Sequence, residues 1–312
     1  MSITAEIGKI NPDNISKDLV LEITSKYGGR TNYIDQYIVI DNQVILPFAY
    51  ATTVLDLPRP QRDGFSEMLV PTVVPPRPEQ VPVLKEAIRS LNSTGSIVIS
   101  AHVGFGKTPC GIFLACRTRH KTLIITKGLP LIKQWGEDIL TFCPTARVQV
   151  LKPKGVFDPN CDFYVVNAQN IVKFPPETWY DIGTVIVDEA HLIMAEVLAR
   201  SLRYIYPRYM IALTATPYRP DGLNKLLDLY FGTRKIIRKL NHPHTAYKVL
   251  TGFVPEVEYT DNGSKKRLKW DSVLKSQAES EDRNELIVKI LRYFSDRKFL
   301  VFVKRVSHGE YL

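Results

Sequence analysis

The sequence predicts an α/β protein built on a parallel β-sheet, and two patterns indicate this. Short apolar runs alternate with stretches of helical spacing between residues 97 and 213, as in a sheet whose strands are buried on both faces. A glycine loop follows one apolar run, and a pair of acidic residues follows another. Ligands bind at the carboxyl ends of such strands, so the polar residues just after the apolar runs are the candidate functional residues.

Composition limits the classes of protein to which the chain can belong. Its 312 residues suggest about two domains, and 45% apolar with 23% charged residues indicate a globular protein. We see no apolar window long enough to span a bilayer and no secretory signal, so we expect an intracellular, soluble protein with no membrane partner. A formal net charge of +9 fits a polyanionic partner such as nucleic acid but does not establish one.

The cysteines form no metal-binding pattern. None of the four is part of a C-x-x-C pair, and no histidine cluster completes a metal set. We expect reduced, partly buried thiols, with a structural disulfide as the less favoured alternative. The cysteines are Cys110, Cys116, Cys143 and Cys161.

Residues 1–72 are expected to form a small accessory domain that contains β-structure. Residues 18–24 are a candidate strand, and residues 37–46 are typical of a hairpin around an Asp-Asn turn. A basic loop at residues 26–32 lies between them. A purely structural role is favoured, and an auxiliary nucleic-acid contact is the alternative.

A proline-dense segment, residues 69–80, predicts an extended linker into the main domain. Pro78 suits the first turn of the helix that follows, where Glu79 complements the helix dipole. Gln80 has two interpretations. It is a plain helix-capping residue, or its amide pairs with the donor and acceptor edge of an adenine. The phosphate-loop pattern about twenty residues later favours adenine binding.

The glycine loop at residues 100–108 has the layout of a phosphate-binding loop: strand, glycines, Lys-Thr and helix. Gly104 and Gly106 allow backbone N–H groups to face a phosphate. Lys107 brings an ammonium group to the outer phosphates, and the Thr108 hydroxyl can bind Mg²⁺. The usual first glycine is replaced by Ala101, and a glycine-rich surface turn is the alternative. The expected ATP-binding residues are Gln80, Ala101, His102, Val103, Gly104, Phe105, Gly106, Lys107 and Thr108.

An acidic pair directly follows the apolar run at residues 184–187. Asp188 is placed to hold Mg²⁺ through water, and Glu189 to orient the water that attacks the γ-phosphate. An acidic helix cap is the alternative, and the distant glycine loop argues against it. The predicted catalytic residues are therefore Glu189, Asp188 and Lys107, and the predicted metal-binding residues are Thr108 and Asp188.

The remaining strand ends carry the other candidates. Thr214 and Thr216 follow residues 210–213 and are expected, with His191, to couple the acidic segment to its neighbours; a plain Thr/Pro turn is the alternative. Trp135 is favoured as a core residue over a base-stacking surface. Four further residues are expected to contact nucleic-acid phosphates, namely Lys127, Gly128, Asn167 and Gln169. The expected strands are 97–99, 122–126, 147–151, 163–166, 184–187 and 210–213, and the expected helices include 83–91, 109–116 and 129–142.

Taken in order, these motifs resemble the first RecA-like lobe of superfamily 2 DEAH-type helicases. The chain looks closest to the XPB/UvsW-like branch and, within it, is similar to transcript-release helicases of poxvirus-like large DNA viruses and their African swine fever virus relatives. The motifs are P-R-P-E-Q at 76–80, A-H-V-G-F-G-K-T at 101–108, T-K-G-L-P-L-I-K-Q-W at 126–135, D-E-A-H at 188–191 and T-A-T-P-Y-R at 214–219.

The resemblance implies ATP-driven translocation on nucleic acid or its unwinding, typically 3′ to 5′. ATP and Mg²⁺ are the implied cofactors, and the resemblance adds Arg77 to the ATP-binding residues. DNA is the first choice of track and RNA the second, with the transcription or repair machinery as a further partner. For a viral protein, the implied location is the host cytoplasm or the virion. A non-catalytic nucleic-acid-binding module is the alternative function, and the motor subunit of a restriction-type nuclease ranks last.

The C-terminal part resembles the opening of a second RecA-like lobe. Residues 247–257 and 299–303 are expected strands, and residues 282–292 an amphipathic helix. The arginine-containing Q-x-x-G-R-x-x-R element of the family is not found. We therefore expect a fragment that hydrolyses ATP poorly alone, with three parts: residues 1–72, the ATP-binding lobe at 73–240, and the start of a second lobe at 241–312.

Overall fold

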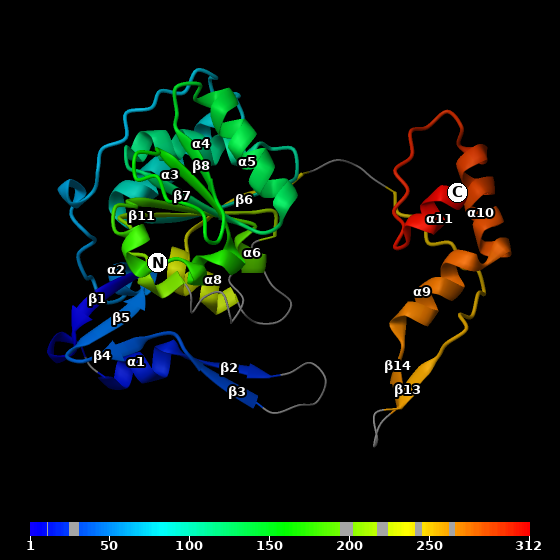
Figure 1. The fold of residues 1–312 in the computed structure, drawn as a ribbon, viewed down its shortest axis with the longest axis horizontal. Coiled ribbons are helices and arrows are strands. Elements are labelled where there is room, and N and C mark those ends of the chain that lie inside the picture. The colour runs from blue at the N-terminus through cyan, green and yellow to red at the C-terminus, as the bar shows by residue number, and fades with distance from the viewer. Residues whose placement is uncertain (11, 25–30, 194–201, 217–223, 241–244, 262–265) are drawn as a thin grey trace. The chain divides into compact units, whose positions relative to one another are not determined.

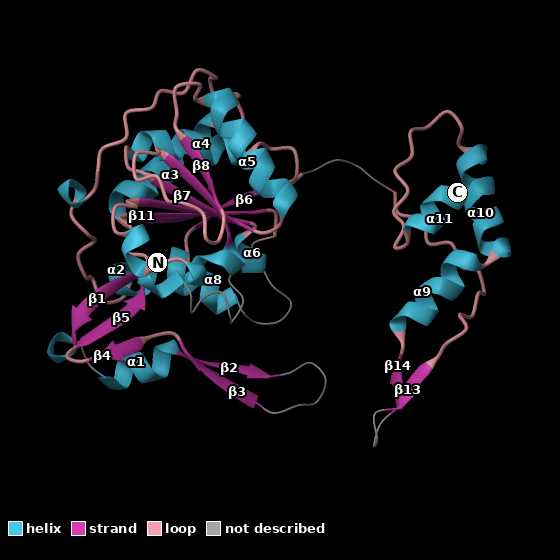
Figure 2. Cartoon of the chain, in the orientation of Figure 1, coloured by secondary structure: helices cyan, strands magenta, loops and turns pink. Residues whose placement is uncertain are grey.

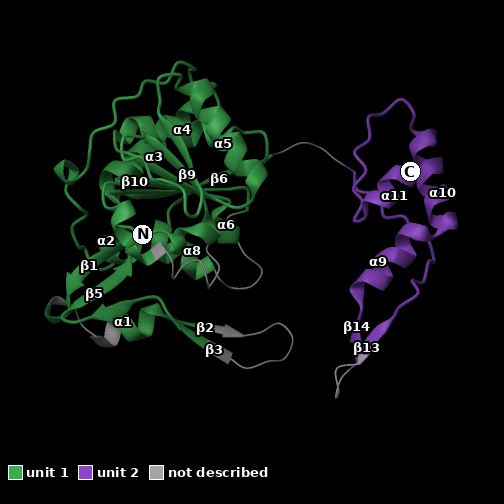
Figure 3. Ribbon diagram, viewed as in Figure 1, with its two compact units in different colours: residues 1–241 green, residues 242–312 purple. Residues whose placement is uncertain are grey.

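The computed structural model describes residues 1–312 except 11, 25–30, 194–201, 217–223, 241–244 and 262–265 (Figure 1). It contains two compact units, residues 1–241 and residues 242–312, which are described separately below (Figure 3). The last three residues of the T-A-T-P-Y-R motif, 217–219, lie outside the described residues.

A seven-stranded parallel sheet forms the centre of unit 1. Its order is β12-β6-β11-β10-β7-β9-β8, so the chain crosses over repeatedly between non-adjacent strands. The expected α/β class is therefore confirmed, with β12 as an additional edge strand. The strands are β6 (Ser96–Ala101), β7 (Thr122–Thr126), β8 (Val148–Leu151), β9 (Phe163–Asn167), β10 (Thr184–Asp188), β11 (Tyr209–Thr214) and β12 (Lys235–Arg238).

Helices cover both faces of this sheet (Figure 2). Successive strand residues point to opposite faces, so Ile97 and Ile99 pack in the core under α3, α4 and α5, while Val98 packs in the core on the other face. The first face is covered by α3 (Val81–Ser93), α4 (Lys107–Thr118) and α5 (Leu129–Phe142), and the second by α2 (Phe48–Thr53), α6 (Ala190–Ile193) and α8 (Asn224–Phe231). Burial on both faces explains why these strands read as nearly unbroken apolar runs.

The helix after the proline-dense segment begins later than expected. Pro78 lies in a turn closed by the Gln80 N–H, which donates to the Arg77 carbonyl at 2.9 Å, and α3 starts at Val81. Pro82 takes the position in the first helical turn that was assigned to Pro78, because proline costs no hydrogen bond there.

Residues 1–72 contain two antiparallel sheets. The first has the order β1-β5-β4, and the expected hairpin is its β4–β5 pair, with Asp41 at φ +52° in the turn. The second pairs β2 with β3; the expected strand 18–24 was too long at its start, because Asp18 and Leu19 end helix α1. These elements are β1 (Ser2–Glu6), α1 (Pro12–Leu19), β2 (Val20–Thr24), β3 (Thr31–Asp35), β4 (Ile38–Ile40) and β5 (Gln43–Pro47).

Contacts join residues 1–72 to the rest of unit 1. The Ser2 N–H donates to the Ile205 carbonyl at 2.9 Å, and the buried Arg203 guanidinium donates to the Asp35 carbonyl. The assignment of residues 1–72 as a domain of its own stays a prediction. Short 3₁₀ helices in unit 1 are η1 (Ile7–Lys9), η2 (Arg62–Gly64), η3 (Ala168–Lys173), η4 (Pro176–Trp179) and η5 (Leu202–Tyr204).

Unit 2 confirms one expected helix and contradicts two expected strands. The helix lies within α10 (Glu281–Tyr293). Residues 247–257 and 299–303 form no strand, and Phe302 is 87% exposed. The described strands of unit 2, β13 (Tyr259–Asp261) and β14 (Lys266–Leu268), pair with each other, so neither apolar run has a strand beside it to complete a sheet. The other helices are α9 (Trp270–Glu279) and α11 (Val306–Tyr311).

None of the helices in the described part of the chain combines the length and apolar character needed to span a membrane.

Candidate functional site

Three adjacent strands bring the main motifs to one edge of the sheet. Thr214 at the end of β11 pairs with Ser100 of β6, and Asp188 at the end of β10 pairs with Leu213 of β11, all in parallel register. Because parallel strands end at the same edge, the loop after β6 and the acidic pair after β10 share that edge. Burial raises the pKa of Asp188, and the positive charge of Lys107 is one of the weaker influences that oppose this rise. This arrangement is the one that the glycine loop and the acidic pair predicted.

The glycine loop turns sharply between β6 and α4. Gly104 and Gly106 have φ of +84° and +87°, in the left-handed region that favours glycine. The Lys107 ammonium donates to the Ala101 carbonyl at 3.1 Å, which closes the loop on itself. Val103 is 82% exposed at the tip, while Phe105 is buried beneath it. The helix begins at Lys107, two residues earlier than expected, so its first N–H groups face the loop.

The loop is also held from outside by the P-R-P-E-Q segment. The Gln80 amide donates to the Phe105 carbonyl at 2.9 Å, and the Arg77 guanidinium donates to the Gly104 carbonyl at 3.2 Å and to the Phe105 carbonyl. The Gln80 side-chain oxygen accepts from the Arg77 N–H at 2.9 Å, and Gln80 is 3% exposed. The amide expected to bind adenine therefore holds the phosphate loop here.

A further hydrogen bond connects the loop to the edge strand. The His102 backbone N–H donates to the Arg238 carbonyl at 3.1 Å, at the end of β12. The His102 ring lies edge-on to Phe105, with ring centroids 5.7 Å apart, and its Nδ1 lies 2.8 Å from the Val103 carbonyl. Residues 102–105 are thus fixed on the β12 side as well as by Gln80.

Asp188 is a buried carboxylate with fixed hydrogen bonds. Its Oδ2 accepts from the Trp135 indole N–H at 2.8 Å, and its Oδ1 accepts from the Glu189 N–H at 3.0 Å. Burial raises the pKa of Asp188, and the Trp135 bond and the Lys107 charge act in the opposite direction. The two bonds orient the carboxylate while leaving each oxygen a second lone pair for another ligand.

Glu189 combines an unusual backbone with a carboxylate oxygen that accepts no hydrogen bond from the described residues. Its φ of +49° lies in the left-handed region, where a side chain normally costs about 1–2 kcal/mol. Its Oε2 is buried, lies 3.4 Å from His191 Nδ1, and has no hydrogen-bond partner among the described residues. Strained residues and unsatisfied polar groups concentrate at functional sites, and both features occur at the residue predicted to orient the attacking water.

His191 connects the acidic segment to the end of β11. Its Nδ1 lies 2.7 Å from the Thr214 hydroxyl, which also donates to the Thr216 carbonyl at 2.9 Å and accepts from the Thr216 N–H at 3.1 Å. The structure therefore brings together the three residues predicted to couple these segments. His191 supplies the direct contact and Thr216 acts through its backbone.

The four residues predicted to contact nucleic acid lie on the other half of the same edge. Thr126 of β7 pairs with Asn167 of β9, which places Lys127 and Gly128 next to the start of η3. Lys127 is exposed, and Gly128 has φ +96° just before α5. The Asn167 side chain accepts from the Gln169 N–H at 3.1 Å and so caps η3. The Asn167 side-chain oxygen is thus occupied in capping η3, which leaves the side-chain NH₂ group for another partner.

The Trp135 bond to Asp188 is a functional contact that sequence reasoning missed. Trp135 was assigned to the core, and it is 1% exposed. A buried indole N–H requires an acceptor, and that requirement was the available signal. The sequence alone does not show that α5 lies over the end of β10.

Comparison with known proteins identifies the family. "Putative helicase 161L" of Invertebrate iridescent virus 6 is 39% identical over 321 residues, covering 100% of this chain and 71% of that protein. "Putative helicase 109L" of Invertebrate iridescent virus 3 is 38% identical, covering 78% of this chain and 80% of that protein. Residues 74–219 match the family model described as "Type III restriction enzyme, res subunit". The chain therefore belongs to a family of superfamily 2 helicases found in large DNA viruses.

Solved structures agree on the fold. The crystal structure of the UvsW helicase from bacteriophage T4 is similar, with a TM-score of 0.51 and 14% identity, covering 73% of this chain and 92% of that chain. At this identity the likeness concerns the fold alone, and it confirms the expected RecA-like parallel sheet.

Proposed function

We propose that this chain is the ATP-binding part of a DEAH-type, nucleic-acid-dependent ATPase that works as a helicase or translocase. The observation that supports this most is the shared sheet edge, where the glycine loop with Lys107 follows β6 and the acidic pair with Asp188 lies at the end of β10. An ammonium group and a carboxylate beside a glycine loop suit a triphosphate and its metal ion. The family membership supports the same activity.

The donor set suits Mg²⁺. Mg²⁺ is usually bound by one or two protein oxygens, phosphate oxygens and water, rather than by a full protein cage. Thr108 and Asp188 offer a hydroxyl and a carboxylate, and no cluster of three or more His, Cys, Asp or Glu side chains occurs among the described residues. The bound ion would neutralise charge on the phosphates, while the Trp135 bond keeps the Asp188 carboxylate in place.

Glu189 would then accept the proton of the attacking water. Its Oε2 has no hydrogen-bond partner among the described residues and lies 3.4 Å from His191 Nδ1, so it can accept a bond from water once the side chain turns toward the nucleotide. Gln80 would bind adenine only after exchanging its bonds to the loop. Nucleotide binding and loop rearrangement are therefore linked in this proposal.

Nucleic acid would cross the half of the edge formed by β7 and β9. Lys127, Gly128, Asn167 and Gln169 would bind phosphates, which makes binding salt-dependent and largely independent of sequence. DNA is the first choice of track and RNA the second. Transcription, repair or recombination in the infected cell is the proposed setting, because the relatives are viral helicases.

Lys107→Ala tests the proposal. It should lower nucleic-acid-stimulated ATP turnover by about 10²–10³-fold, the usual cost of removing one preorganised charge-stabilising group. Binding to single-stranded DNA, measured by fluorescence anisotropy, should change little. The control is Lys133→Ala, because the Lys133 side chain is 80% exposed and forms a surface ion pair with Glu137 one turn further along α5. Unchanged turnover in Lys107→Ala would favour the alternative, a non-catalytic nucleic-acid-binding module.

A further inference from the structure

Two thiols meet at the end of α4 that is far from the phosphate loop. Cys116 lies in the last turn of α4, Cys143 directly follows α5, and their sulfur atoms are 3.6 Å apart. All four cysteines are free thiols, and the Cys161 sulfur donates to the Asp158 carboxylate at 3.7 Å. The contact thus sets Cys116 and Cys143 apart from the other cysteines.

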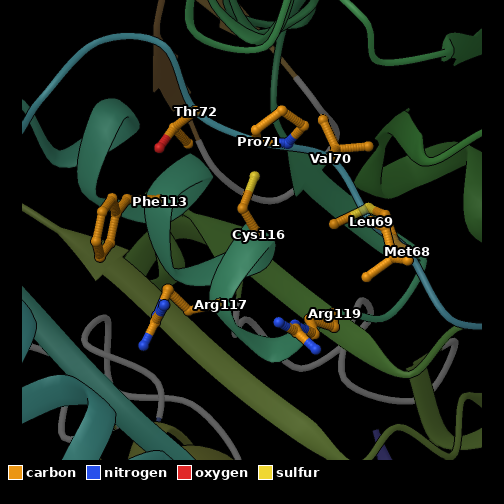
Figure 4. Close-up of a pocket in the computed structure, with 9 residues that line it drawn as sticks. All are labelled: Met68, Leu69, Val70, Pro71, Thr72, Phe113, Cys116, Arg117 and Arg119. Carbon is orange, nitrogen blue, oxygen red and sulfur yellow. The ribbon is translucent and has the colours of Figure 1, made fainter.

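A pocket gives small molecules access to this pair. Residues 68–72 pass over the end of α4, held by the Met68 N–H donating to the Arg119 carbonyl and the Val73 N–H donating to the Phe142 carbonyl, each at 2.9 Å. Beneath them lies a pocket of about 410 Å³, and Cys116 forms part of its wall. Figure 4 shows the Cys116 sulfur directed toward Pro71. Cys143 is fully buried, so Cys116 is the accessible sulfur.

We propose that Cys116 and Cys143 form an oxidation site, at which a peroxide converts the two thiols into a disulfide between α4 and α5. Cys116 as a thiolate attacks one peroxide oxygen, the O–O bond breaks, and a sulfenic acid forms while the released hydroxide takes up the Cys116 proton as water. The Cys143 sulfur then attacks the Cys116 sulfur, and the S–O bond breaks. The leaving hydroxide takes the Cys143 proton, so two thiols and one hydrogen peroxide yield one disulfide and two waters.

The contact between the sulfurs favours the second step, because it already holds the two atoms that must bond 3.6 Å apart. The hydrogen bond with Cys143, and after it burial, raise the pKa of the Cys116 thiol, so few Cys116 side chains are thiolates at neutral pH and the first step is the slower one. The bond from Cys116 lowers the pKa of the Cys143 thiol, which assists its attack in the second step. The disulfide would link the helices that begin at the phosphate loop and at Leu129, next to the predicted nucleic-acid contacts.

Peptide mapping by mass spectrometry tests the proposal on the full, reduced chain. After treatment with hydrogen peroxide and alkylation, we expect a cross-linked peptide pair containing Cys116 and Cys143 that is two hydrogens lighter, at least tenfold more abundant than any other pair. Dithiothreitol should remove it. Cys116→Ser and Cys143→Ser should each prevent it, whereas Cys110→Ser and Cys161→Ser should not.

Two results would overturn the inference. One is conversion of Cys116 to sulfinic or sulfonic acid with Cys143 still alkylated. The other is a set of cross-links that involve Cys110 or Cys161 as often as the proposed pair. Both outcomes can be seen in the unsubstituted protein, so the test does not depend on how the serine variants fold.

Discussion

At the phosphate loop, two glycines with similar backbone angles differ in what surrounds them. A Cβ added at Gly104 meets no atom within 4 Å, whereas one added at Gly106 lies 2.5 Å from the Gln80 amide nitrogen and 2.7 Å from the Arg77 guanidinium. Both substitutions carry the backbone cost of a positive φ, and only the second also displaces the side chains that hold the loop.

Gly106→Ala should therefore destabilise the nucleotide-free protein more than Gly104→Ala. We expect about 1–2 kcal/mol from the backbone in either variant, and about 1 kcal/mol more for each hydrogen bond of Gln80 or Arg77 that is lost in Gly106→Ala. Urea unfolding measures the difference, and Gly104→Ala is the matched control. Equal decreases in the free energy of unfolding would show that the Gln80 and Arg77 side chains can move aside without losing stabilising hydrogen bonds.

Trp135→Phe should move the acidic limb of the pH–rate profile to higher pH. The Trp135 N–H lowers the pKa of Asp188, so its removal raises that pKa further. In the proposed mechanism Asp188 must be ionised to hold the metal, so activity is lost as pH falls through this pKa. Trp135→Phe should therefore lose activity at a higher pH than the unsubstituted protein does. Steady-state kcat/KM measured across pH checks the shift.

The control for this experiment is Tyr164→Phe. Tyr164 is also fully buried, and its hydroxyl donates to the Asp158 carbonyl at 2.8 Å, without contact to Asp188. Loss of this hydrogen bond should lower the free energy of unfolding by about 0.5–1.5 kcal/mol, as for a typical hydrogen bond. The acidic limb of the pH–rate profile should stay at the same pH. A common shift in both variants would point to general destabilisation.

At the level of elements, the contact between His191 and Thr214 joins β11 to the segment after β10. We expect His191→Ala and Thr214→Val each to reduce stimulation of ATPase activity by nucleic acid more than the basal rate. The effects should not add, with an interaction energy of about 0.5–3 kcal/mol, as for residues in direct contact. A double-mutant cycle on the stimulated rate measures this, and fully additive effects would contradict a coupling role.

The strands of the sheet could be predicted because a strand that is buried on both faces has apolar residues at nearly every position. Val185 and Ile186 pack on opposite faces, so the run is apolar throughout. Residues 299–303 are equally apolar, yet they are exposed and form no strand. A single strand is not an independent unit, because its backbone groups need a neighbouring strand, and an apolar run does not reveal whether that neighbour exists.

The candidate site could be predicted in its outline, although its internal bonds could not. Motif spacing predicted that Lys107 and Asp188 share one edge, because parallel strands align their carboxyl ends. The use of Gln80 to hold the loop, and of Trp135 to hold Asp188, depends on side-chain directions set by tertiary packing. Such contacts between distant segments leave no periodic pattern in the sequence.

At the scale of the whole molecule, the carboxyl edge of the sheet divides into two halves. The first, formed by β6, β11 and β10, carries the proposed ATP site, and the second, formed by β7 and β9, carries the proposed nucleic-acid contacts. β7 lies beside β10, so the two halves meet along one pair of strands. A net charge of +9 is consistent with binding dominated by phosphates.

The logarithm of the binding constant for single-stranded DNA should therefore fall linearly as the logarithm of the salt concentration rises. Lys127→Ala should make the slope shallower by about one, the contribution of a single lysine–phosphate contact. Fluorescence anisotropy between low and moderate potassium chloride concentrations measures the slope. Lys133→Ala again serves as the control, and an unchanged slope in Lys127→Ala would exclude this residue from the phosphate-binding surface.

The bond between the His102 N–H and the Arg238 carbonyl has a mechanical consequence. β12 borders the sheet at β6, and soon after its last residue the chain leaves unit 1 for unit 2. The backbone of the glycine loop is thus hydrogen-bonded to the last residue of the final strand of unit 1. We therefore expect that, if a triphosphate moves residue 102 when it binds, Arg238 at the end of β12 moves with it.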